Sequence, residues 1–458
     1  MQTSVDADYL VVGAGAMGLA FTDALVDHSD ARVMIVDRRD GVGGHWREAY
    51  PFVRLHVASA FYGVASTLLG GSLQESGPEA GLYERASQPE VLAYFQDVLA
   101  RLETTGRVRF LRRSEYADGV VVRLGSGERL AVPESCRVVD ARYLSPTIPA
   151  EVPPSFYVGD GVRVMPVNDL VELEDAPSQY VIVGSGKTAT DAIVWLLGKG
   201  TDPGSVRWVR PRDPWMFNRE RLQPDPAVFL GMAADLWECA ETASSVDDIY
   251  LRLEERGVML RVDRAVAPRM ARVPVIARWE IELLQTVEDV VRLGHVRSVE
   301  RGRMHLAEGS VPIADNAVVV HCAASGLQNP PMVPLWRRDA ITLQLVRSGF
   351  PCFGAALTGY VEATRDDDAE KNRLCPPSHY GDTLADWIEM NVLGSRNTAV
   401  FSAEPDIKAW ADGVALNPNR IPPGHPPSPA LDRVCERLAE HAAPGLTRAV
   451  ELIRQART

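Results

Sequence analysis

Apolar runs, glycine turns and helical patterns follow one another in the same order at two places along the chain. Near the beginning, the apolar run 9–12 leads into a glycine-rich turn, a helical pattern and a second apolar run at 32–37. Further along, the run 180–183 leads into another glycine-rich turn, a helical pattern and the run 206–210. Strands that are apolar throughout are typical of parallel sheets covered on both faces. The pattern therefore predicts an α/β protein with two such units.

The rest of the pattern predicts how these units are joined. Residues 138–141 read as a strand that returns to the first unit, and the proline-rich stretch 145–154 reads as a linker. Residues 226–290 contain few glycines and are expected to be largely helical. The apolar run 317–321 predicts a buried strand, which we expect to rejoin the sheet of the first unit. Residues 427–457 have an amphipathic helical pattern.

The first glycine turn reads Gly-Ala-Gly-Ala-Met-Gly at 13–18. Gly13 permits the tight turn, Gly15 lets the backbone approach a pyrophosphate, and Gly18 permits close packing of helix on strand. The phosphates would lie at the start of the helix, where free N–H groups and the helix dipole favour anions. Asp37 ends the next strand, where its carboxylate is placed to accept hydrogen bonds from a ribose. The turn predicts a dinucleotide site, and the alternative is a turn that only packs a helix on a strand.

The second turn, at 184–189, has Ala189 in place of the third glycine, which the packing role tolerates. Its next strand ends in Arg210 and is followed by Arg212, where the first unit has an acid. Guanidinium groups there suit the 2′-phosphate of NADPH, whereas a carboxylate would repel it. The alternative is that both arginines are solvated surface charges. Val181 stands where a Walker-type phosphate loop needs glycine, so an NTPase is not expected.

Composition narrows the possible functions. The chain has 458 residues, of which 46% are hydrophobic and 24% charged, as in a packed globular protein. The formal net charge of −13 argues against general affinity for nucleic acid or anionic lipid. The six scattered cysteines include no CxxC pair, and neither a signal peptide nor a membrane-spanning apolar stretch is visible. These features predict a reduced, cytoplasmic protein.

A further signature follows the acid at the end of the second strand. Asp37 is followed by Gly43-Gly44-His45-Trp46 and then by Tyr50-Pro51. This order resembles the acid, GGxW and YP signature of the class B flavoprotein monooxygenases, which include the flavin-containing, Baeyer–Villiger and N-hydroxylating enzymes. The resemblance implies an FAD domain interrupted by an NADPH domain, both Rossmann-like.

The resemblance also implies domain bounds, cofactors and site residues. We expect residues 1–165 to form the first part of the FAD-binding domain, 170–315 the NADPH-binding domain with a helical insertion, and 316–458 the second part of the FAD domain with C-terminal helices. The residues expected at FAD are Gly13, Ala14, Gly15, Gly18, Asp37, Arg38, Gly43, Gly44 and Trp46. Those expected at NADPH are Gly184, Ser185, Gly186, Lys187, Thr188, Arg210 and Arg212. For Trp46, an ordinary core tryptophan is the alternative.

His56 is the candidate catalytic residue. It stands where the family places an asparagine or aspartate near the reactive edge of the flavin. A histidine there can donate a hydrogen bond to a flavin peroxide or hold a proton near neutral pH. The alternative is a structural histidine in an apolar stretch.

Three stretches depart from the family pattern. Residues 156–170 contain no histidine, so the FxGxxxH fingerprint of the Baeyer–Villiger enzymes is missing. The family's Ala-Thr-Gly is replaced by Ala141-Arg142-Tyr143, whose bulk is expected to alter NADPH placement or access to the flavin. Residues 341–377 match no motif and are expected to close the FAD site or line the substrate pocket, with an exposed acidic loop as the alternative. Asp366 to Asp368 lack further ligands at metal spacing, so no metal is expected.

Together these features predict an FAD-dependent, NADPH-using oxidoreductase. The favoured reaction is that of a monooxygenase, which uses molecular oxygen to oxidise a small organic substrate through a flavin C4a-(hydro)peroxide. One alternative is a flavin dehydrogenase or reductase that does not use oxygen productively. Another is a non-catalytic nucleotide-binding protein.

Overall fold

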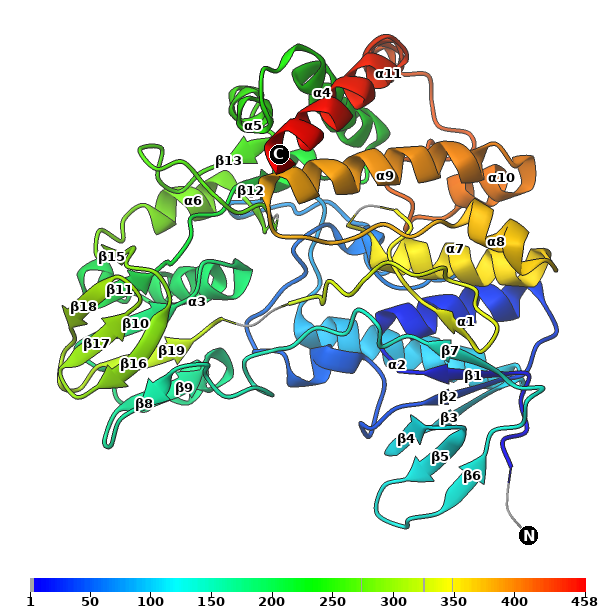
Figure 1. Ribbon diagram of the computed structural model, residues 1–458, viewed down its shortest axis with the longest axis horizontal. Coiled ribbons are helices and arrows are strands. Elements are labelled where there is room, and N and C mark those ends of the chain that lie inside the picture. Colours follow the sequence, from blue (N-terminus) through cyan, green and yellow to red (C-terminus); the bar gives the residue numbers. More distant parts are fainter. Residues whose placement is uncertain (1–3, 273, 324–325, 348) are drawn as a thin grey trace.

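A five-stranded parallel sheet forms the base of the first unit (Figure 1). The computed structural model describes residues 4–272, 274–323, 326–347 and 349–458. The strand order is β20-β7-β1-β2-β3, with every neighbouring pair parallel. Its strands are β1 (Tyr9–Val12), β2 (Val33–Val36), β3 (Val108–Leu111), β7 (Arg137–Asp140) and β20 (Ala340–Thr342). The chain leaves this sheet after β7 and re-enters it only at β20, so the second unit is inserted into the first, as expected.

The two faces of this sheet are covered differently. Side chains that point to one face of β1 and β2 share a core with α1 (Ala16–His28) and α2 (Gln88–Thr104). Those that point to the other face share a core with a small antiparallel sheet. That sheet consists of β4 (Ser114–Ala117), β5 (Val120–Arg123) and β6 (Arg129–Ala131). Burial on both faces explains why β2 consists of apolar residues throughout.

The second unit repeats this plan. Its parallel sheet has the order β15-β11-β10-β19-β9, and α3 (Lys187–Gly198) packs on one face. The strands are β9 (Arg163–Pro166), β10 (Tyr180–Val183), β11 (Val206–Val209), β15 (Val290–Val291) and β19 (Val318–His321). The other face carries a sheet made of β8 (Tyr157–Val158), β16 (Val296–Glu300), β17 (Arg303–Leu306) and β18 (Gly309–Pro312). The short 3-10 helix η3 (Val167–Glu172) joins β9 to β10, and η4 (Pro203–Ser205) joins α3 to β11.

One strand lies in a different sheet from the one expected. The apolar run 317–321 does form a buried strand, but β19 pairs with β10 and β9 of the second sheet. The place expected for it in the first sheet is taken by β20, which pairs with β7. A run of four valines and alanines fits any buried parallel strand, so its composition does not select a sheet. The sequence boundary drawn at 315/316 therefore falls before the last strand of the second sheet.

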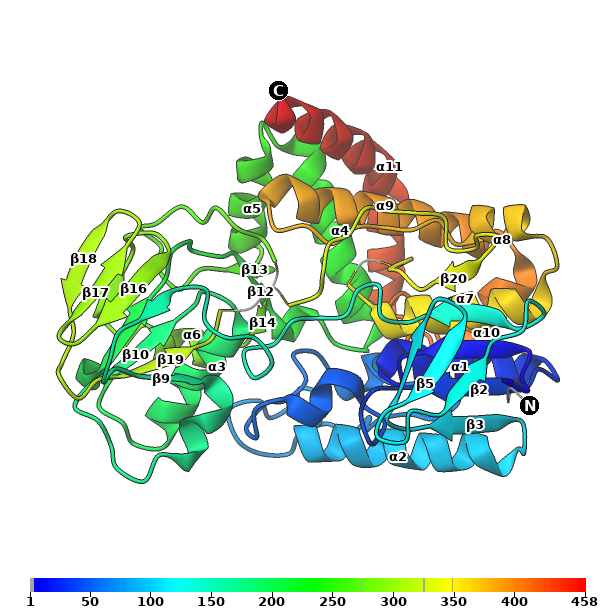
Figure 2. The ribbon, with the colours of Figure 1, turned by 60° about the horizontal axis from the view of Figure 1, so that its bottom comes forward.

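Helices from two distant parts of the sequence form a layer above both sheets (Figures 1 and 2). Residues 226–290 contribute α4 (Pro226–Thr242), α5 (Val246–Glu255) and α6 (Arg278–Leu284), together with the short strands β13 (Met259–Leu260) and β14 (Val275–Ile276). Both strands pair with β12 (Met216–Asn218), beside the 3-10 helix η5 (Arg219–Arg221). The C-terminal part contributes α8 (Asp368–Leu374), α9 (Leu384–Ser402), α10 (Pro405–Gly413) and α11 (Pro429–Arg457). Because α11 packs on α4 and α9, the end of the chain closes this layer. The helical tail expected at 427–457 is confirmed.

The stretch 341–377, which matched no motif, contains a buried helix. Strand β20 leads into α7 (Pro351–Thr364), which packs along α1. Gly359 makes this contact possible, because a Cβ there would overlap the backbone oxygen of Phe21. Asp367 caps the start of α8 by accepting the N–H of Glu370. Asp366 and Asp367 are exposed in the short connection between α7 and α8, so the alternative of an exposed acidic loop applies to that connection and not to the buried helix.

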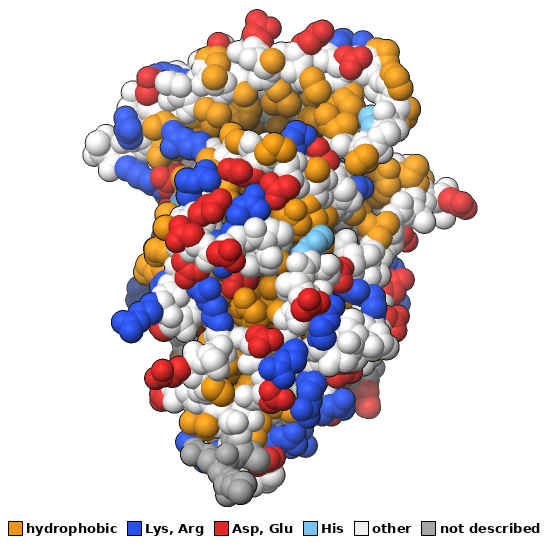
Figure 3. All heavy atoms as spheres, turned by 90° about the vertical axis from the view of Figure 1, so that its right-hand side faces the viewer, with side chains coloured by type: hydrophobic (Ala, Val, Ile, Leu, Met, Phe, Trp, Pro, Cys, Tyr) orange, Lys and Arg blue, Asp and Glu red, His pale blue; other side chains and the backbone are white. Residues whose placement is uncertain are grey.

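Among the described residues, no helix is both long and apolar enough to cross a membrane. On the face shown in Figure 3, positive and negative side chains are intermixed over most of the surface. Hydrophobic side chains gather near the top of that view, where the surface is hollowed.

Candidate functional site

The first glycine turn joins β1 to α1 at the carboxyl edge of the first sheet. Gly13 has a φ of +112°, which favours glycine. A Cβ at Gly18 would overlap the carbonyl oxygen of Gly13, so this position needs a glycine for packing. Gly15 is the N-cap of α1 and offers no side chain to the free N–H groups of the first helical turn. These N–H groups face the place where the sequence predicts a pyrophosphate.

The GGxW segment lies directly against this turn. Gly43 donates its N–H to the backbone oxygen of Ala14 at 2.9 Å. A Cβ built on Gly15 would lie 3.6 Å from the Cα of Gly44. The backbone of the GGxW segment thus contacts the backbone of the glycine turn. Gly43 and Gly44 both adopt positive φ angles. The sequence signature and the glycine turn form one site.

Asp37 and Arg38 make contacts that the sequence did not predict. The carboxylate of Asp37 accepts the backbone N–H of Ala14 at 2.8 Å and that of Arg39 at 2.9 Å. Asp37 therefore holds the turn in shape, and a ribose would share the remaining lone pairs of its oxygens. Arg38 is exposed and pairs with Glu151 of the linker at 2.7 Å.

Trp46 is a buried part of the first unit. Its indole N–H donates to the hydroxyl of Tyr62 at 2.6 Å, and the two rings meet edge to face. Its backbone oxygen accepts from the side chain of Gln88 at the start of α2. These contacts agree with the alternative of a core tryptophan, because the only polar atom of the indole already has a partner.

The second turn leaves an open, uncapped helix start. Gly184 has a φ of +143°, and Gly186 is the N-cap of α3 without any side-chain cap. A Cβ at Gly186 would meet no atom within 4 Å, so a ligand can approach the backbone there. The hydroxyl of Ser185 is buried and has no hydrogen-bond partner among the residues that the structure describes. Thr188 is half-buried in the first turn of α3.

Lys187 points away from this turn. Its ammonium group forms ion pairs with Asp191 and with Glu280, the latter at 3.3 Å. The hydroxyl of Tyr50 donates to the other oxygen of Asp191 at 2.7 Å. The side chain of Lys187 thus belongs to the interface between the two units, and only its backbone N–H is left for a phosphate.

Arg210 and Arg212 follow β11, as expected, but they differ in environment. Arg210 is 1% exposed, stacks over the ring of Trp208 at 4.5 Å and pairs with Asp213 at 2.9 Å. Its Nε and Nη1 have no hydrogen-bond partner. Burial lowers its pKa to about 10, so the group stays charged at neutral pH. Arg212 is exposed and pairs with Asp382 at 3.0 Å. The alternative of a solvated surface charge therefore fits Arg212 but not Arg210.

His56 lies deep between the two units while keeping some contact with solvent. Burial, followed by the charge of Lys187, lowers its pKa to about 4. The imidazole is therefore neutral near pH 7, with one N–H donor and one lone pair. Its backbone oxygen accepts the Nε–H of Arg219 at 3.1 Å.

A buried group of charges surrounds this position, and sequence reasoning missed it. Arg219 is fully buried and pairs with Glu79 at 2.5 Å and with Glu280 at 2.7 Å. Glu79 also pairs with Arg85 at 2.8 Å. Arg219, Glu79, Glu280, Arg85, Lys187 and Asp191 are named the interface network here. Its members come from both units and from the helical layer, and no spacing in the sequence signals that they meet.

The buried charges predict that the protein loses stability in acid in two steps. Burial alone would raise the pKa of Glu280, but the charges of Lys187 and Arg219 outweigh it and hold that pKa to about 2. Below about pH 6.5, protons bind His56 more readily in the unfolded chain, so stability falls as pH drops towards 4. Below about pH 4.5, protons bind Glu280 more readily in the unfolded chain, so stability falls further as the pH drops to about 2. Melting temperatures measured across this range check both steps, and His56→Gln should remove part of the first step only.

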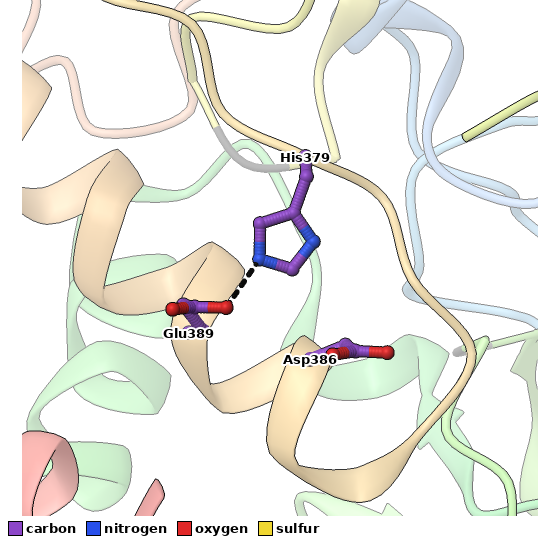
Figure 4. A group of neighbouring side chains, drawn as sticks. All are labelled: His379, Asp386 and Glu389. Carbon is purple, nitrogen blue, oxygen red and sulfur yellow. Dashed lines mark hydrogen bonds and ion pairs between the residues drawn. The ribbon is translucent and has the colours of Figure 1, made fainter. Parts of the chain in front are cut away.

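A second polar cluster lies at the start of α9 (Figure 4). His379, Asp386 and Glu389 each offer one ligand atom, and these atoms lie within 4.8 Å of one another. Nε2 of His379 lies 2.7 Å from Glu389. The guanidinium of Arg457, near the end of α11, pairs with Asp386 at 2.9 Å and Glu389 at 2.6 Å. Because Arg457 of α11 forms ion pairs with both carboxylates of α9, the cluster joins the two helices.

Comparison with known proteins identifies relatives and a shared fold. Residues 11–58 match the family model of an NAD(P)-binding Rossmann-like domain. The chain is 39% identical over 419 residues to the uncharacterized protein Rv2000 of Mycobacterium tuberculosis, and the alignment covers 90% of this chain and 78% of the relative. The same values hold for the uncharacterized protein Mb2023 of Mycobacterium bovis. The open crystal structure of cyclohexanone monooxygenase matches 88% of this chain and 98% of its own, with a TM-score of 0.51 and 14% identity. This match confirms at the level of fold the resemblance noted in the sequence.

Proposed function

This chain belongs to the same family as the mycobacterial proteins Rv2000 and Mb2023, and we propose that it is an FAD-dependent, NADPH-using monooxygenase that acts on a small organic substrate. The observation that carries the proposal is the presence of two uncapped glycine turns, at the carboxyl edges of two parallel sheets in one chain. Ligands of open α/β sheets bind at these edges. The name of cyclohexanone monooxygenase, which has the same fold, agrees with the proposed reaction.

The first turn fits the pyrophosphate of FAD. Helix α1 begins at Gly15 without a side-chain cap, and so does α3 at Gly186. By contrast, a serine, threonine or aspartate side chain accepts a backbone N–H at the start of α4, α5, α8, α9 and α11. Free N–H groups at a helix start require an acceptor, and phosphate oxygens supply one. The pyrophosphate would lie against the backbone of Gly13 and Gly15, beside Gly44.

The second turn fits the phosphates of NADPH. The unpaired hydroxyl of Ser185 and the open space at Gly186 lie at the same helix start. The two unpaired nitrogens of Arg210 follow the neighbouring strand, where a 2′-phosphate is recognised in this fold. Arg210 lines a narrow hollow together with Arg261 and Asp263, among others.

When bound, FAD would take a hydride from NADPH and deliver its electrons to oxygen, which is chemistry that the cofactor supplies. The chain's own contribution is to hold the two dinucleotides and to shape the site between the units. His56 would offer a neutral N–H donor at that site, because its pKa of about 4 keeps it uncharged. The interface network would fix the two units relative to each other, since its buried carboxylates need cations from both sides. The six cysteines form no disulfide, which agrees with a reducing compartment such as the cytoplasm.

The use of oxygen is tested directly on the flavin-loaded protein. The enzyme is reduced with NADPH without oxygen and then mixed with isotopically labelled oxygen in the presence of cyclohexanone, thioanisole or N,N-dimethylbenzylamine. We expect one labelled oxygen atom to appear in the product of at least one probe. Rapid reoxidation without any labelled product, together with anaerobic turnover on an artificial electron acceptor, would instead identify a flavin dehydrogenase or reductase.

Arg210→Met is expected to weaken selection of NADPH over NADH. Hydrogen bonds to a charged group contribute about 1.5–3 kcal/mol, so the KM for NADPH should rise about 10- to 100-fold. The KM for NADH should change little, because NADH lacks the 2′-phosphate. Both constants are measured from anaerobic flavin reduction. Arg303→Met, at an exposed arginine of β17, serves as the control and should leave both constants unchanged. An equal rise for both nucleotides in Arg210→Met would contradict the assignment.

A further inference from the structure

A groove of about 460 Å³ lies at the linker that joins the two units. It is lined by linker residues 149–154, by Val158 of β8, by residues 162 and 164–166 in and beside β9, and by His321 at the end of β19. Figure 1 shows the chain running from β7 of the first unit to β8 and β9 of the second. Sites for small molecules typically have volumes of about 300–1,000 Å³, so the groove has the size of a ligand site. It is named the linker groove here.

The walls of the linker groove are largely apolar. Apart from Glu151 and His321, every residue that lines it is a proline, valine, alanine or methionine. The carboxylate of Glu151 pairs with Arg38 at 2.7 Å and with Arg39 at 2.6 Å. Among the described residues, no arginine or lysine lines the groove, and neither does any residue predicted to bind FAD or NADPH. An anionic ligand such as a dinucleotide therefore has no counter-charge in these walls, which favours a neutral, apolar ligand.

His321 places one polar group in these walls. It is 3% exposed, and its Nδ1 forms no hydrogen bond within the part of the chain that the structure describes. Burial lowers the pKa of His321, so the imidazole is neutral near pH 7. A neutral imidazole has one N–H donor and one lone pair, and a buried polar atom without a partner is unfavourable. A hydroxyl or carbonyl group of a bound molecule would supply the missing partner.

We propose that the linker groove binds a small neutral molecule with an apolar body and one hydroxyl or carbonyl group, which forms a hydrogen bond with His321. The valines, the prolines and Met165 would contact the apolar body. This site is additional to the dinucleotide sites and to the site at His56, so it goes beyond the proposed function. Because the linker and the second unit both line the groove, a bound molecule would hold the linker against that unit.

Two probes that differ by one hydroxyl group test the class of ligand. Binding of 2-naphthol and of naphthalene is measured by ligand-observed NMR, with FAD and NADP⁺ in excess so that the dinucleotide sites are filled. A hydroxyl group favours water, so naphthalene would bind more tightly to a purely apolar site. We expect 2-naphthol to bind about three- to tenfold more tightly instead, because its hydrogen bond to His321 outweighs that cost. The anion 2-naphthoate should bind more weakly than either probe.

Two variants at exposed valines locate the site. Val152 and Val171 are 41% and 39% exposed, but only Val152 lines the linker groove. Val152→Glu places a charge in an apolar wall and should weaken binding of both probes by about tenfold or more. Val171→Glu adds the same charge outside the groove and should leave both dissociation constants unchanged. Since both valines lie at the surface, we expect both variants to fold.

His321→Leu tests the hydrogen bond. The variant removes a buried polar atom that has no partner in the described structure, so the melting temperature should stay the same or rise. Naphthalene should bind as before and 2-naphthol should become the weaker ligand, so that the order of the two probes reverses. A marked loss of stability would show that the fold itself needs the imidazole, and it would contradict the role given to His321.

The other results also decide the proposal. Absence of binding to the unchanged protein, or weaker binding of 2-naphthol than of naphthalene, would overturn the class of ligand. Equal affinities in Val152→Glu and Val171→Glu would place the probes outside the linker groove. A preference for 2-naphthol that survives in His321→Leu would exclude His321 as the partner. None of these measurements depends on reduction of the flavin or on the use of oxygen, so they are independent of the tests of the proposed function.

Discussion

Gly15→Ala is expected to yield a folded protein that no longer retains FAD. The backbone at Gly15 has an ordinary φ of −84°, and an added Cβ would meet only the Cα of Gly44 at 3.6 Å. The fold therefore tolerates the methyl group, but the group occupies the approach of the pyrophosphate. Loss of one charge-assisted hydrogen bond, at about 1.5–3 kcal/mol, weakens FAD binding by about 10- to 100-fold, and loss of two weakens it further. Flavin content after purification and the dissociation constant of added FAD measure the effect.

Two matched variants separate this effect from damage to the fold. Gly186→Ala places the same methyl group in open space at the second turn, so it should weaken NADPH binding and leave FAD bound. Gly18→Ala should destabilise the whole protein, because its Cβ would overlap the oxygen of Gly13. Full retention of FAD by Gly15→Ala would contradict the position assigned to the pyrophosphate.

Arg219→Met is expected to produce the largest loss of stability. Arg219 is fully buried and balances Glu79 and Glu280. Its removal leaves two buried carboxylates short of a cation, which costs about 3–5 kcal/mol. The loss is measured as a change in the free energy of unfolding in urea. Since Arg219 also holds the backbone oxygen of His56, we expect slower flavin reduction by NADPH in the protein that remains folded.

An exposed arginine provides the control for this variant. Arg32 pairs with Asp6 and Asp8 at the surface, where water screens the charges. Arg32→Met should therefore leave stability nearly unchanged. If Arg219→Met were as stable as Arg32→Met, the interface network would not hold the two units together.

Local geometry explains which parts of the site the sequence predicted. The requirement for glycine at Gly13 and Gly18 arises within one turn, so spacing in the sequence reveals it. The contact between Gly15 and Gly44 is also recognisable, because both belong to one signature. The insertion of the second unit into the first was implied by the resemblance to the monooxygenases, and the structure confirms it.

Long-range partners explain what the sequence did not predict. Strand β19 pairs with β10 and β9 of the second sheet. An apolar sequence does not indicate which strands it will pair with, so this placement could not be predicted. Lys187 lies in the second glycine turn, as predicted, but its ammonium group forms an ion pair with Glu280, which is far from it in the sequence. Glu79 and Arg219 were missed for the same reason, since each appears as an ordinary charge until the fold brings them together.

Anaerobic titration with NADPH tests the central claim most directly, which is that one chain holds a flavin and its reductant together. The purified protein is loaded with FAD, freed of excess and titrated in the visible spectrum without oxygen. We expect the flavin absorption to bleach with one NADPH per flavin, and NADH to bleach it far less effectively. A protein that binds no FAD, or whose bound FAD remains oxidised at excess NADPH, would contradict the account.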